Sequence, residues 1–143
     1  MAIPPIPSQL TLEIVTPDHA LTHAEVDEVE IPAAEGYIGV LPGHTPLLTS
    51  LQVGEMWYRR GGERFYLAVA YGFAEVQPDR VVVLAQVAER AEDIDVARAD
   101  AAKRRAESRL SKPPVEYDVD RARLSLMKSL IRLQVSAKAR TRA

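Results

Sequence analysis

The segment from Glu89 to Ala99, ERAEDIDVARA, separates two parts of the chain that have different sequence patterns. Before it, Gly and Pro recur at short intervals between apolar runs, which is typical of short strands joined by turns. After it, the chain is poor in Gly and rich in Ala and charged residues, a composition that favours helix. Acidic residues open the segment, and Arg98 follows within one helical turn. We interpret the segment as the joint between a β domain and a helical arm, and as a candidate binding site.

The formal net charge of −2 conceals opposite charges in the two parts. Residues 1–90 carry 12 acidic residues and 5 Lys or Arg, whereas residues 91–143 carry 8 acidic residues and 13 Lys or Arg. The basic arm is therefore expected to rest on its own β domain or on another acidic surface. The predicted organisation is a loose tail at residues 1–9, a β domain at residues 10–90 and a helical domain at residues 91–143.

Several classes of protein are excluded by composition. The chain has no Cys, so disulfides, thiol chemistry and Cys-based metal sites are excluded, and a reducing compartment fits this composition. No apolar run approaches the ~20 residues that span a bilayer. The first residues, MAIPPIPSQ, lack the basic start and the long apolar run of a signal peptide.

The β domain is predicted to be an antiparallel sandwich or flattened barrel, because many short strands recur at regular spacing. Three stretches precede residue 32, where Pro32 is expected to end the third strand: Leu10–Thr16, Ala20–Ala24 and Val26–Ile31. In the third, Val29 and Ile31 are expected to share one face. Two hairpins follow, with turns at Gly61–Gly62 and Pro78–Asp79. Their strands are Gly54–Arg60, Glu63–Ala70, Gly72–Gln77 and Arg80–Ala88.

The histidines do not form a recognisable metal or catalytic motif. His19 and His23 are four residues apart, but the strand pattern and Pro17 argue against a helical metal-binding pair. His44, between Pro42-Gly43 and Pro46, is interpreted as a turn residue. Because no nucleophile elbow or phosphate-binding glycine loop is present, an enzyme active site is not expected in the β domain.

Two helices are predicted after the joint. Asp93 or Asp95 is expected to cap the first, which runs to about Leu110 and is stopped by Pro113-Pro114. Asp118 or Asp120 is expected to cap the second, which runs to about Lys138, so that the pair forms an αα-hairpin. The apolar line of the second helix comprises Leu126, Leu130, Leu133 and Ala137, widened by Met127 and Ile131.

The opposite side of the second helix is polar and basic, and it includes Ser129 and Ser136. After Asp120 there are seven Lys or Arg and no acidic residue. Two interpretations remain open: a solvated basic face, or a face that binds a phosphate group or an acidic protein segment. Nucleic acid is disfavoured, because the arm has one aromatic residue, Tyr117, and the whole chain is acidic.

Four motifs, followed by the helical hairpin, together resemble the ε subunit of bacterial and chloroplast F-type ATP synthases: EIVTPD (Glu13–Asp18), GVLPGHTPLLT (Gly39–Thr49), GFAEVQPDRVVVLA (Gly72–Ala85) and AERAEDIDVARA (Ala88–Ala99). The resemblance covers about Leu10 to Val135. It implies an α+β fold, with an N-terminal ten-stranded antiparallel β-sandwich and a C-terminal two-helix αα-hairpin. It also implies a non-catalytic regulatory subunit of a proton-translocating complex, peripheral to the cytoplasmic face of the bacterial inner membrane.

In this family the sandwich binds the γ subunit and the ring of c subunits. The resemblance places these contacts at Glu35, Gly36, Tyr37, Ile38 and His44. Tyr37 stands where some relatives carry an acid, which removes the carboxylate that an ionic contact to the ring would need.

The family's helices lie folded on the sandwich or extend beside γ toward the α and β subunits, where they inhibit ATP hydrolysis. The implied inhibitory face is basic and would meet an acidic segment of the β subunit; it comprises Arg121, Arg123, Lys128, Arg132 and Lys138.

Some members bind ATP as a regulatory ligand on the folded hairpin, with no other cofactor. Their pattern Ile/Leu-Asp-x-x-Arg-Ala matches Ile94, Asp95, Arg98 and Ala99. The accompanying acid matches Glu89, and Arg105, Lys128 and Arg132 supply the other cationic groups. Lys128 replaces the arginine of the best ATP binders and lacks its planar fork. The alternatives to a rotor subunit are a free-standing ATP sensor and a small β-barrel enzyme.

Overall fold

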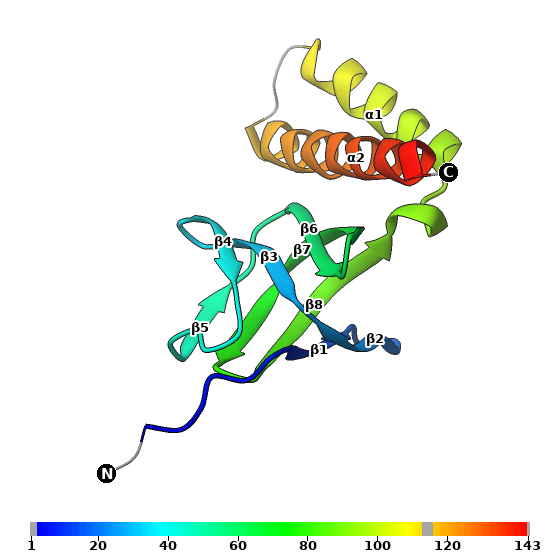
Figure 1. Ribbon diagram of the computed structural model, residues 1–143. Coiled ribbons are helices and arrows are strands. Elements are labelled where there is room, and N and C mark those ends of the chain that lie inside the picture. Colours follow the sequence, from blue (N-terminus) through cyan, green and yellow to red (C-terminus); the bar gives the residue numbers. More distant parts are fainter. Residues whose placement is uncertain (1–2, 113–115, 143) are drawn as a thin grey trace.

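The computed structural model describes residues 3–112 and 116–142, which form a β domain followed by two helices (Figure 1). The strands are β1 (Leu10–Val15), β2 (Ala20–Val26), β3 (Glu28–Ala33), β4 (Gly36–Val40), β5 (Leu47–Ser50), β6 (Gly54–Arg60), β7 (Glu63–Gln77) and β8 (Arg80–Arg90). A short 3-10 helix, η1 (Ala91–Asp93), leads to α1 (Val96–Leu110) and α2 (Glu116–Arg142). A β-sandwich followed by two helices is thus confirmed.

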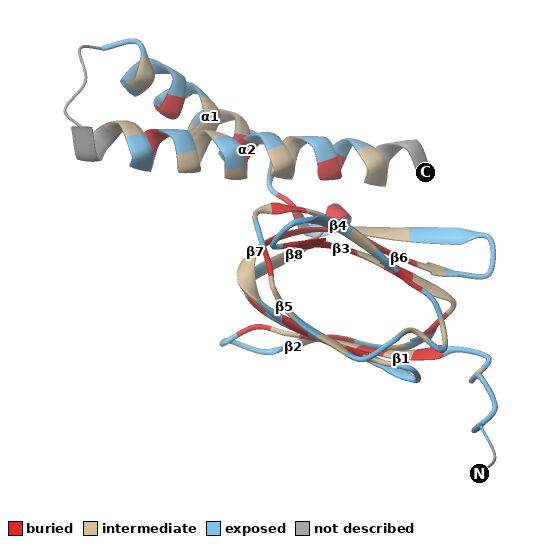
Figure 2. Ribbon diagram, turned by 90° about the vertical axis from the view of Figure 1, so that its left-hand side faces the viewer, coloured by how far each residue is buried: buried red, intermediate tan, exposed pale blue. Residues whose placement is uncertain are grey.

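Strands β7 and β8 belong to both layers of the sandwich. The first half of β7 pairs with β6, and its second half pairs with β5. β8 pairs with β7 along nearly its whole length and, at its start, with β1 in parallel. One layer therefore contains β4, β3, β6, the first half of β7 and the second half of β8. The other layer contains β5, β1, β2, the second half of β7 and the first half of β8 (Figure 2). The described chain has eight continuous strands instead of the expected ten, because two strands serve both layers.

The backbone of β7 bends at Tyr71 and Gly72, where φ is 60° and 115°. A Cβ on Gly72 would lie 2.0 Å from the carbonyl oxygen of Leu84, so only glycine fits there. The prediction of separate strands at Glu63–Ala70 and Gly72–Gln77 is wrong. Pairing with β8 continues across the bend in one register, so the two pieces form a single strand.

The core lies between the two layers and is built from alternating positions of the strands. Leu10, Leu12 and Ile14 of β1 are fully buried. Val29 and Ile31 of β3 are also fully buried, as their alternation predicted. Pro32 does not end β3, because the pairing with β6 stops at Glu30 and the missing N–H is not needed on that side.

The predicted N-terminal cap is confirmed for α1 and is wrong for α2. Asp95 caps α1, since its side chain accepts a hydrogen bond from the backbone N–H of Arg98 at 3.0 Å. α2 begins at Glu116, so Asp118 and Asp120 lie inside the helix and do not cap it. The predicted stop at Pro113-Pro114 lies outside the described residues.

Small residues, spaced seven apart, form the contact between α1 and α2. The buried residues are Ala99 and Ala106 on α1, and Ala122, Ser129 and Ser136 on α2. Ala and Ser let the two helix backbones approach closely. The buried serine hydroxyls donate to carbonyl oxygens of their own helix, Ser129 to Ser125 and Ser136 to Leu133.

The predicted apolar line is therefore not the most buried face of α2. Leu126 and Leu133 are half-buried, while Leu130 and Ala137 are exposed, as is Met127. The prediction failed because size, not polarity, decides which face can enter a close helix pair. Within the described residues, no helix is long and apolar enough to cross a membrane, and no group of three metal-binding side chains occurs.

A candidate nucleotide and docking site between helix α2 and the sandwich

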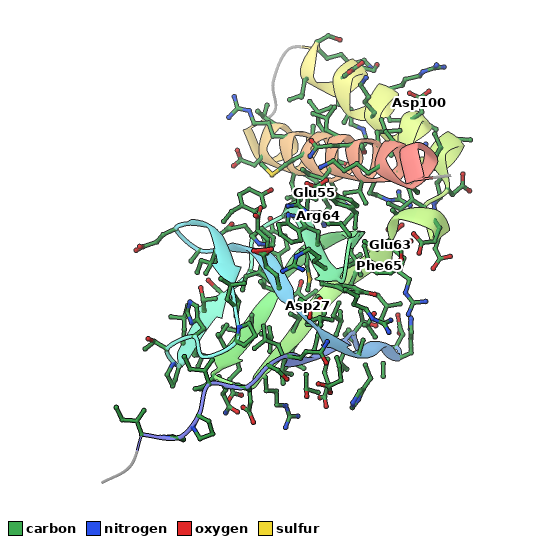
Figure 3. All side chains as sticks on the ribbon, in the orientation of Figure 1. Asp27, Glu55, Glu63, Arg64, Phe65 and Asp100 are labelled. Atoms are coloured by element: carbon green, nitrogen blue, oxygen red, sulfur yellow. The ribbon has the colours of Figure 1, made fainter. Side chains whose placement is uncertain are left out.

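The outer face of one layer carries two glutamates on either side of an alanine. Ala68 of β7 pairs with Glu55 of β6 on one side and with Glu89 of β8 on the other. Residues that pair across neighbouring strands point to the same face of the sheet. Figure 3 shows Glu55 on the sandwich beneath α2. Ala68 is buried in one cluster with Val135 of α2, Ala91 and Ile94.

Glu89 and Arg132 form an ion pair that joins the sandwich to α2. Nε of Arg132 lies 3.0 Å from Oε1 of Glu89, and its Nη2 donates to Oε2 at 3.1 Å. Both side chains are partly shielded from solvent. The structure thus brings together two of the residues that the ATP-binding pattern selected.

Lys128 lies one helical turn before Arg132 and faces the same part of the sandwich. Its Nζ lies 5.7 Å from the centre of the Tyr71 ring. Lys128 and Arg132 line a cavity of about 50 Å³ together with Val53, Ala68, Val69, Ala70, Val87 and Ile131. A nucleotide needs a site of several hundred Å³. In this arrangement, the cavity is too small for ATP and the Arg132 side chain already has an anionic partner.

The residues of the ATP-binding pattern in α1 and just before it have mixed surroundings. Ile94 and Ala99 are buried and serve packing, and Asp95 is the cap of α1. Arg98 and Arg105 are exposed, and neither forms an ion pair with a described residue. They remain available for an anion that approaches the hairpin from solvent.

The basic face of α2 is divided by its contact with the sandwich. Arg121 and Arg123 are exposed. Lys128, Arg132 and Lys138 turn toward the sandwich, and Nζ of Lys138 donates to Oε2 of Glu55 at 2.7 Å. Of the two surfaces expected for the basic arm, its own β domain or another acidic surface, the structure shows α2 on its own β domain.

The residues predicted to contact γ and the c ring lie in two separate places. Glu35, Gly36, Tyr37 and Ile38 belong to the β3–β4 turn and the start of β4, where they line an open hollow. His44 lies in the next turn, where its backbone N–H donates to the carbonyl oxygen of Leu41 at 3.1 Å. Its Nδ1 lies 2.6 Å from the carbonyl oxygen of Thr45, which fits the role of a turn residue.

An exposed apolar surface, not selected from the sequence, lies on the other layer of the sandwich. Leu48, Phe73 and Leu84 are exposed on one face, since Phe73 pairs with Leu84 and with Ser50, two residues from Leu48. Beside Phe73 and Leu84 there is an open, mainly apolar hollow. Neighbouring exposed apolar side chains of this kind commonly mark a protein interface.

Sequence reasoning also missed Glu55, Ala68, Tyr66 and Tyr71. Strand alternation places Glu55 on an outer face, but its partner Lys138 is 83 residues away. No local signal in the sequence could identify this contact.

Comparison with known proteins gives matches along most of the chain. Residues 9–91 match the family "ATP synthase, Delta/Epsilon chain, beta-sandwich domain", and residues 92–137 match the family "ATP synthase, Delta/Epsilon chain, long alpha-helix domain". The chain is 47% identical over 131 residues to ATP synthase epsilon chain 2 of Syntrophotalea carbinolica, covering 91% of this chain and 95% of that protein. It is 48% identical over 125 residues to the ATP synthase epsilon chain of Desulforamulus reducens, covering 87% and 95%.

The fold also resembles chains in two solved assemblies. A chain of the Euglena gracilis mitochondrial ATP synthase structure, containing OSCP, F1 and the c-ring, superposes with a TM-score of 0.80 at 24% identity, covering 98% of this chain and 86% of that one. A chain of the Tetrahymena thermophila central stalk and c-ring structure gives a TM-score of 0.59 at 11% identity, covering 91% and 95%. At such identities the likeness is one of fold.

Proposed function

The chain belongs to the delta/epsilon family of ATP synthase subunits, as a non-catalytic epsilon chain, and from this premise we propose that it joins the γ subunit to the c ring and restrains ATP hydrolysis through its helices. The observation that carries the proposal is the polar docking of α2. Three of its cationic side chains contact the sandwich, two of them through glutamates. Ion pairs can be exchanged for pairs with another acidic surface, whereas a large apolar interface cannot be exchanged as readily.

The folded hairpin is the non-inhibitory arrangement in this proposal. Release of α2 frees Lys128, Arg132 and Lys138 to join Arg121 and Arg123 in a basic face that meets the α and β subunits. Met127 and Leu130 are already exposed on the folded hairpin. These apolar side chains would be covered when the extended helix lies against a partner.

ATP is proposed to bind the folded hairpin and to stabilise it. Arg98 and Arg105 on α1, with Lys128 and Arg132 on α2, would bind the phosphates, next to Glu89, Ile94, Asp95 and Ala99. The Glu89–Arg132 pair has to open, because the present cavity does not admit a nucleotide. Shifting a two-state equilibrium from 1:99 to 99:1 takes roughly 5.5 kcal/mol of differential binding. Several charge-assisted contacts of ~1.5–3 kcal/mol each supply much of that difference.

The sandwich supplies the proposed rotor contacts. The apolar surface of Leu48, Phe73 and Leu84 fits the γ subunit, because an apolar interface suits a permanent partner. The turn with Glu35, Gly36, Tyr37 and Ile38, and the turn with His44, are proposed to meet the c ring. In a bacterium the chain would lie peripherally on the cytoplasmic face of the inner membrane and take part in proton-coupled ATP synthesis.

Truncation tests the regulatory proposal. A chain ending at Ala91 keeps every strand of the sandwich and removes α1 and α2. ATP synthase assembled with this chain should hydrolyse ATP faster than the enzyme with the full chain, while γ and the c ring still copurify with it. Equal hydrolysis rates in the two enzymes would reject the inhibitory role, and loss of γ would reject the assignment of rotor binding to the sandwich.

A further inference from the structure

Glu55 contacts Lys138 in the C-terminal part of α2, away from the proposed nucleotide contacts. Both carboxylate oxygens of Glu55 approach Nζ of Lys138, Oε1 at 2.6 Å and Oε2 at 2.7 Å. The same Nζ lies 4.6 Å from the centre of the Tyr66 ring. Lys138 thus has a carboxylate and the face of an aromatic ring around its charge, which are two kinds of group that attract a cation.

The Glu55 carboxylate is the more enclosed member of this pair. The side chain of Glu55 is 12% exposed, and that of Lys138 is 37% exposed. Glu55 lies on the outer face of the sheet beneath α2, so both charged groups are hydrated once α2 leaves the sandwich. While α2 is docked, the pair is shielded from solvent on its Glu55 side. A charge-assisted contact in such a partly shielded place is stronger than an exposed ion pair.

The apolar contact between α2 and the β domain is small. Its buried members are Ala68, Ala91, Ile94 and Val135, two of which are alanines, and Tyr66, Ile131 and Ala139 are partly buried against them. Val135 is 0% exposed and lies between Arg132 and Lys138 in sequence. Val135, in one cluster with Ala68, is thus flanked along α2 by two ion pairs, from Arg132 to Glu89 and from Lys138 to Glu55, which add to this apolar contact.

We infer that Glu55, with the Tyr66 ring, is an anionic receptor for Lys138 that holds the end of α2 on the sandwich independently of nucleotide. The regulatory meaning of this receptor rests on the proposed function, because it keeps one cation of the basic inhibitory face occupied. An acidic surface on a partner has to compete with Glu55 for Lys138 before the helix can extend. ATP acts at Arg132, and Glu55 acts at Lys138, so the two restraints are additive.

A distance measurement on the isolated full chain tests this inference. The chain has no Cys, so Gly62→Cys and Gln134→Cys provide two labelling sites without other changes. Both positions are exposed, and a Cβ on Gly62 meets no atom within 4 Å. Spin labels at these sites report the fraction of chains in which α2 has left the sandwich, without nucleotide and without the other subunits.

Glu55→Gln and Lys138→Gln should each raise the ratio of released to docked chains by about tenfold, a change of ~1.4 kcal/mol. The double variant should be no more released than Lys138→Gln alone, because Lys138→Gln already removes the contacts of Nζ with both Glu55 and the Tyr66 ring. Glu13→Gln is the matched control for Glu55→Gln, since Glu13 is an ion-paired strand glutamate whose partners, His23 and Arg80, lie in the sandwich.

The inference is overturned if Glu55→Gln and Lys138→Gln release α2 no more than Glu13→Gln does, or if their effects add in the double variant. Lys138→Gln is a change near a helix end and leaves the sandwich core intact, so a docking defect in it cannot come from misfolding. Hydrolysis by the assembled enzyme is read separately. Release without stronger inhibition would reject the proposed function and leave the receptor in place.

Discussion

The carboxylate of Glu89 on β8 accepts hydrogen bonds from the guanidinium of Arg132 on α2, 43 residues later in the chain. The Arg132 guanidinium, which would bind a triphosphate in the proposed ATP site, is therefore already paired with Glu89. In the proposed function, nucleotide binding on the hairpin is an exchange of anions at Arg132. The net affinity is expected to reflect the difference between the two partners and not the full strength of a phosphate contact.

Substitution of Arg98 on α1 or of Arg132 on α2 should weaken ATP binding. Arg98→Ala deletes a charge-assisted contact of ~1.5–3 kcal/mol, which corresponds to a loss of roughly 10- to 150-fold in affinity. Arg132→Ala should cause a smaller loss, because it also removes the competing pair with Glu89. Isothermal calorimetry on the full chain measures this loss. Arg104→Ala is the control, because Arg104 is exposed and pairs with Asp100 on its own helix at 2.9 Å. Affinity that is unchanged in both test variants would reject the residue assignment.

Lys128→Arg should strengthen ATP binding. A guanidinium grips phosphate at two points, whereas an ammonium acts as a single charge. A gain of several-fold, about 1 kcal/mol, is expected in the same titration. Lys103→Arg on α1 is a matched control for the general effect of this substitution. The Lys128 hypothesis fails if the two variants bind ATP equally well.

Gly72→Ala should destabilise the sandwich strongly. The new methyl group would meet the Leu84 carbonyl oxygen at 2.0 Å, and φ of 115° is unfavourable for any side chain. Overpacking and backbone strain each cost about 1–3 kcal/mol, so a loss of about 2–6 kcal/mol is expected in urea denaturation. Gly62→Ala should change the free energy of unfolding by less than about 1 kcal/mol, since nothing lies within 4 Å of its added Cβ. Similar losses in both variants would contradict the bend as the cause.

Asp27→Asn should make the free energy of unfolding fall less steeply as the pH decreases. The backbone N–H of Gly61 donates to Asp27 at 2.6 Å, and Gln9 donates at 3.2 Å. These bonds, the Gly61 bond first, hold the pKa of Asp27 below its ordinary value. Because the folded pKa is the lower one, the ionised carboxylate stabilises the fold above the unfolded pKa of about 3.9. That contribution disappears as the pH falls through the folded pKa.

Urea denaturation in steps from about pH 6 to about pH 2 measures this contribution. The wild-type chain should lose stability across the acid range more steeply than Asp27→Asn does. Asp93→Asn, an exposed position in η1, serves as the control and should follow the wild-type curve. Parallel curves for Asp27→Asn and the wild type would show that Asp27 has no such role.

The sequence predicts the secondary structure well where a pattern is local. Alternation identified β6 in full, and the turns at Gly61–Gly62 and Pro78–Asp79 connect β6 to β7 and β7 to β8 as expected. The pattern failed at Gly72, where a glycine that bends a continuous strand looks the same as a glycine that ends one. It failed again on α2, where Ser129 and Ser136 look solvent-facing but are small enough to enter the helix pair.

The candidate site could be predicted only in part. The cluster from Glu89 to Ala99 is local in sequence, and the resemblance supplied Lys128 and Arg132. Glu55 and Tyr66 could not be predicted, because their role depends on α2 packing over them, and the sequence does not show which strand residues α2 covers. The exposed surface of Leu48, Phe73 and Leu84 was equally hidden, since its residues come from three strands that are neighbours only in the folded sheet.

The path of β7 and β8 has a mechanical consequence. Each strand is one covalent chain through both layers, so the layers cannot slide past each other unless these two backbones are stretched or the bend at Gly72 is opened. A sideways load applied at the exposed apolar surface on one layer is carried by main-chain bonds to the layer beneath α2. A torque applied to one layer of the sandwich therefore rotates both layers together and does not shear them.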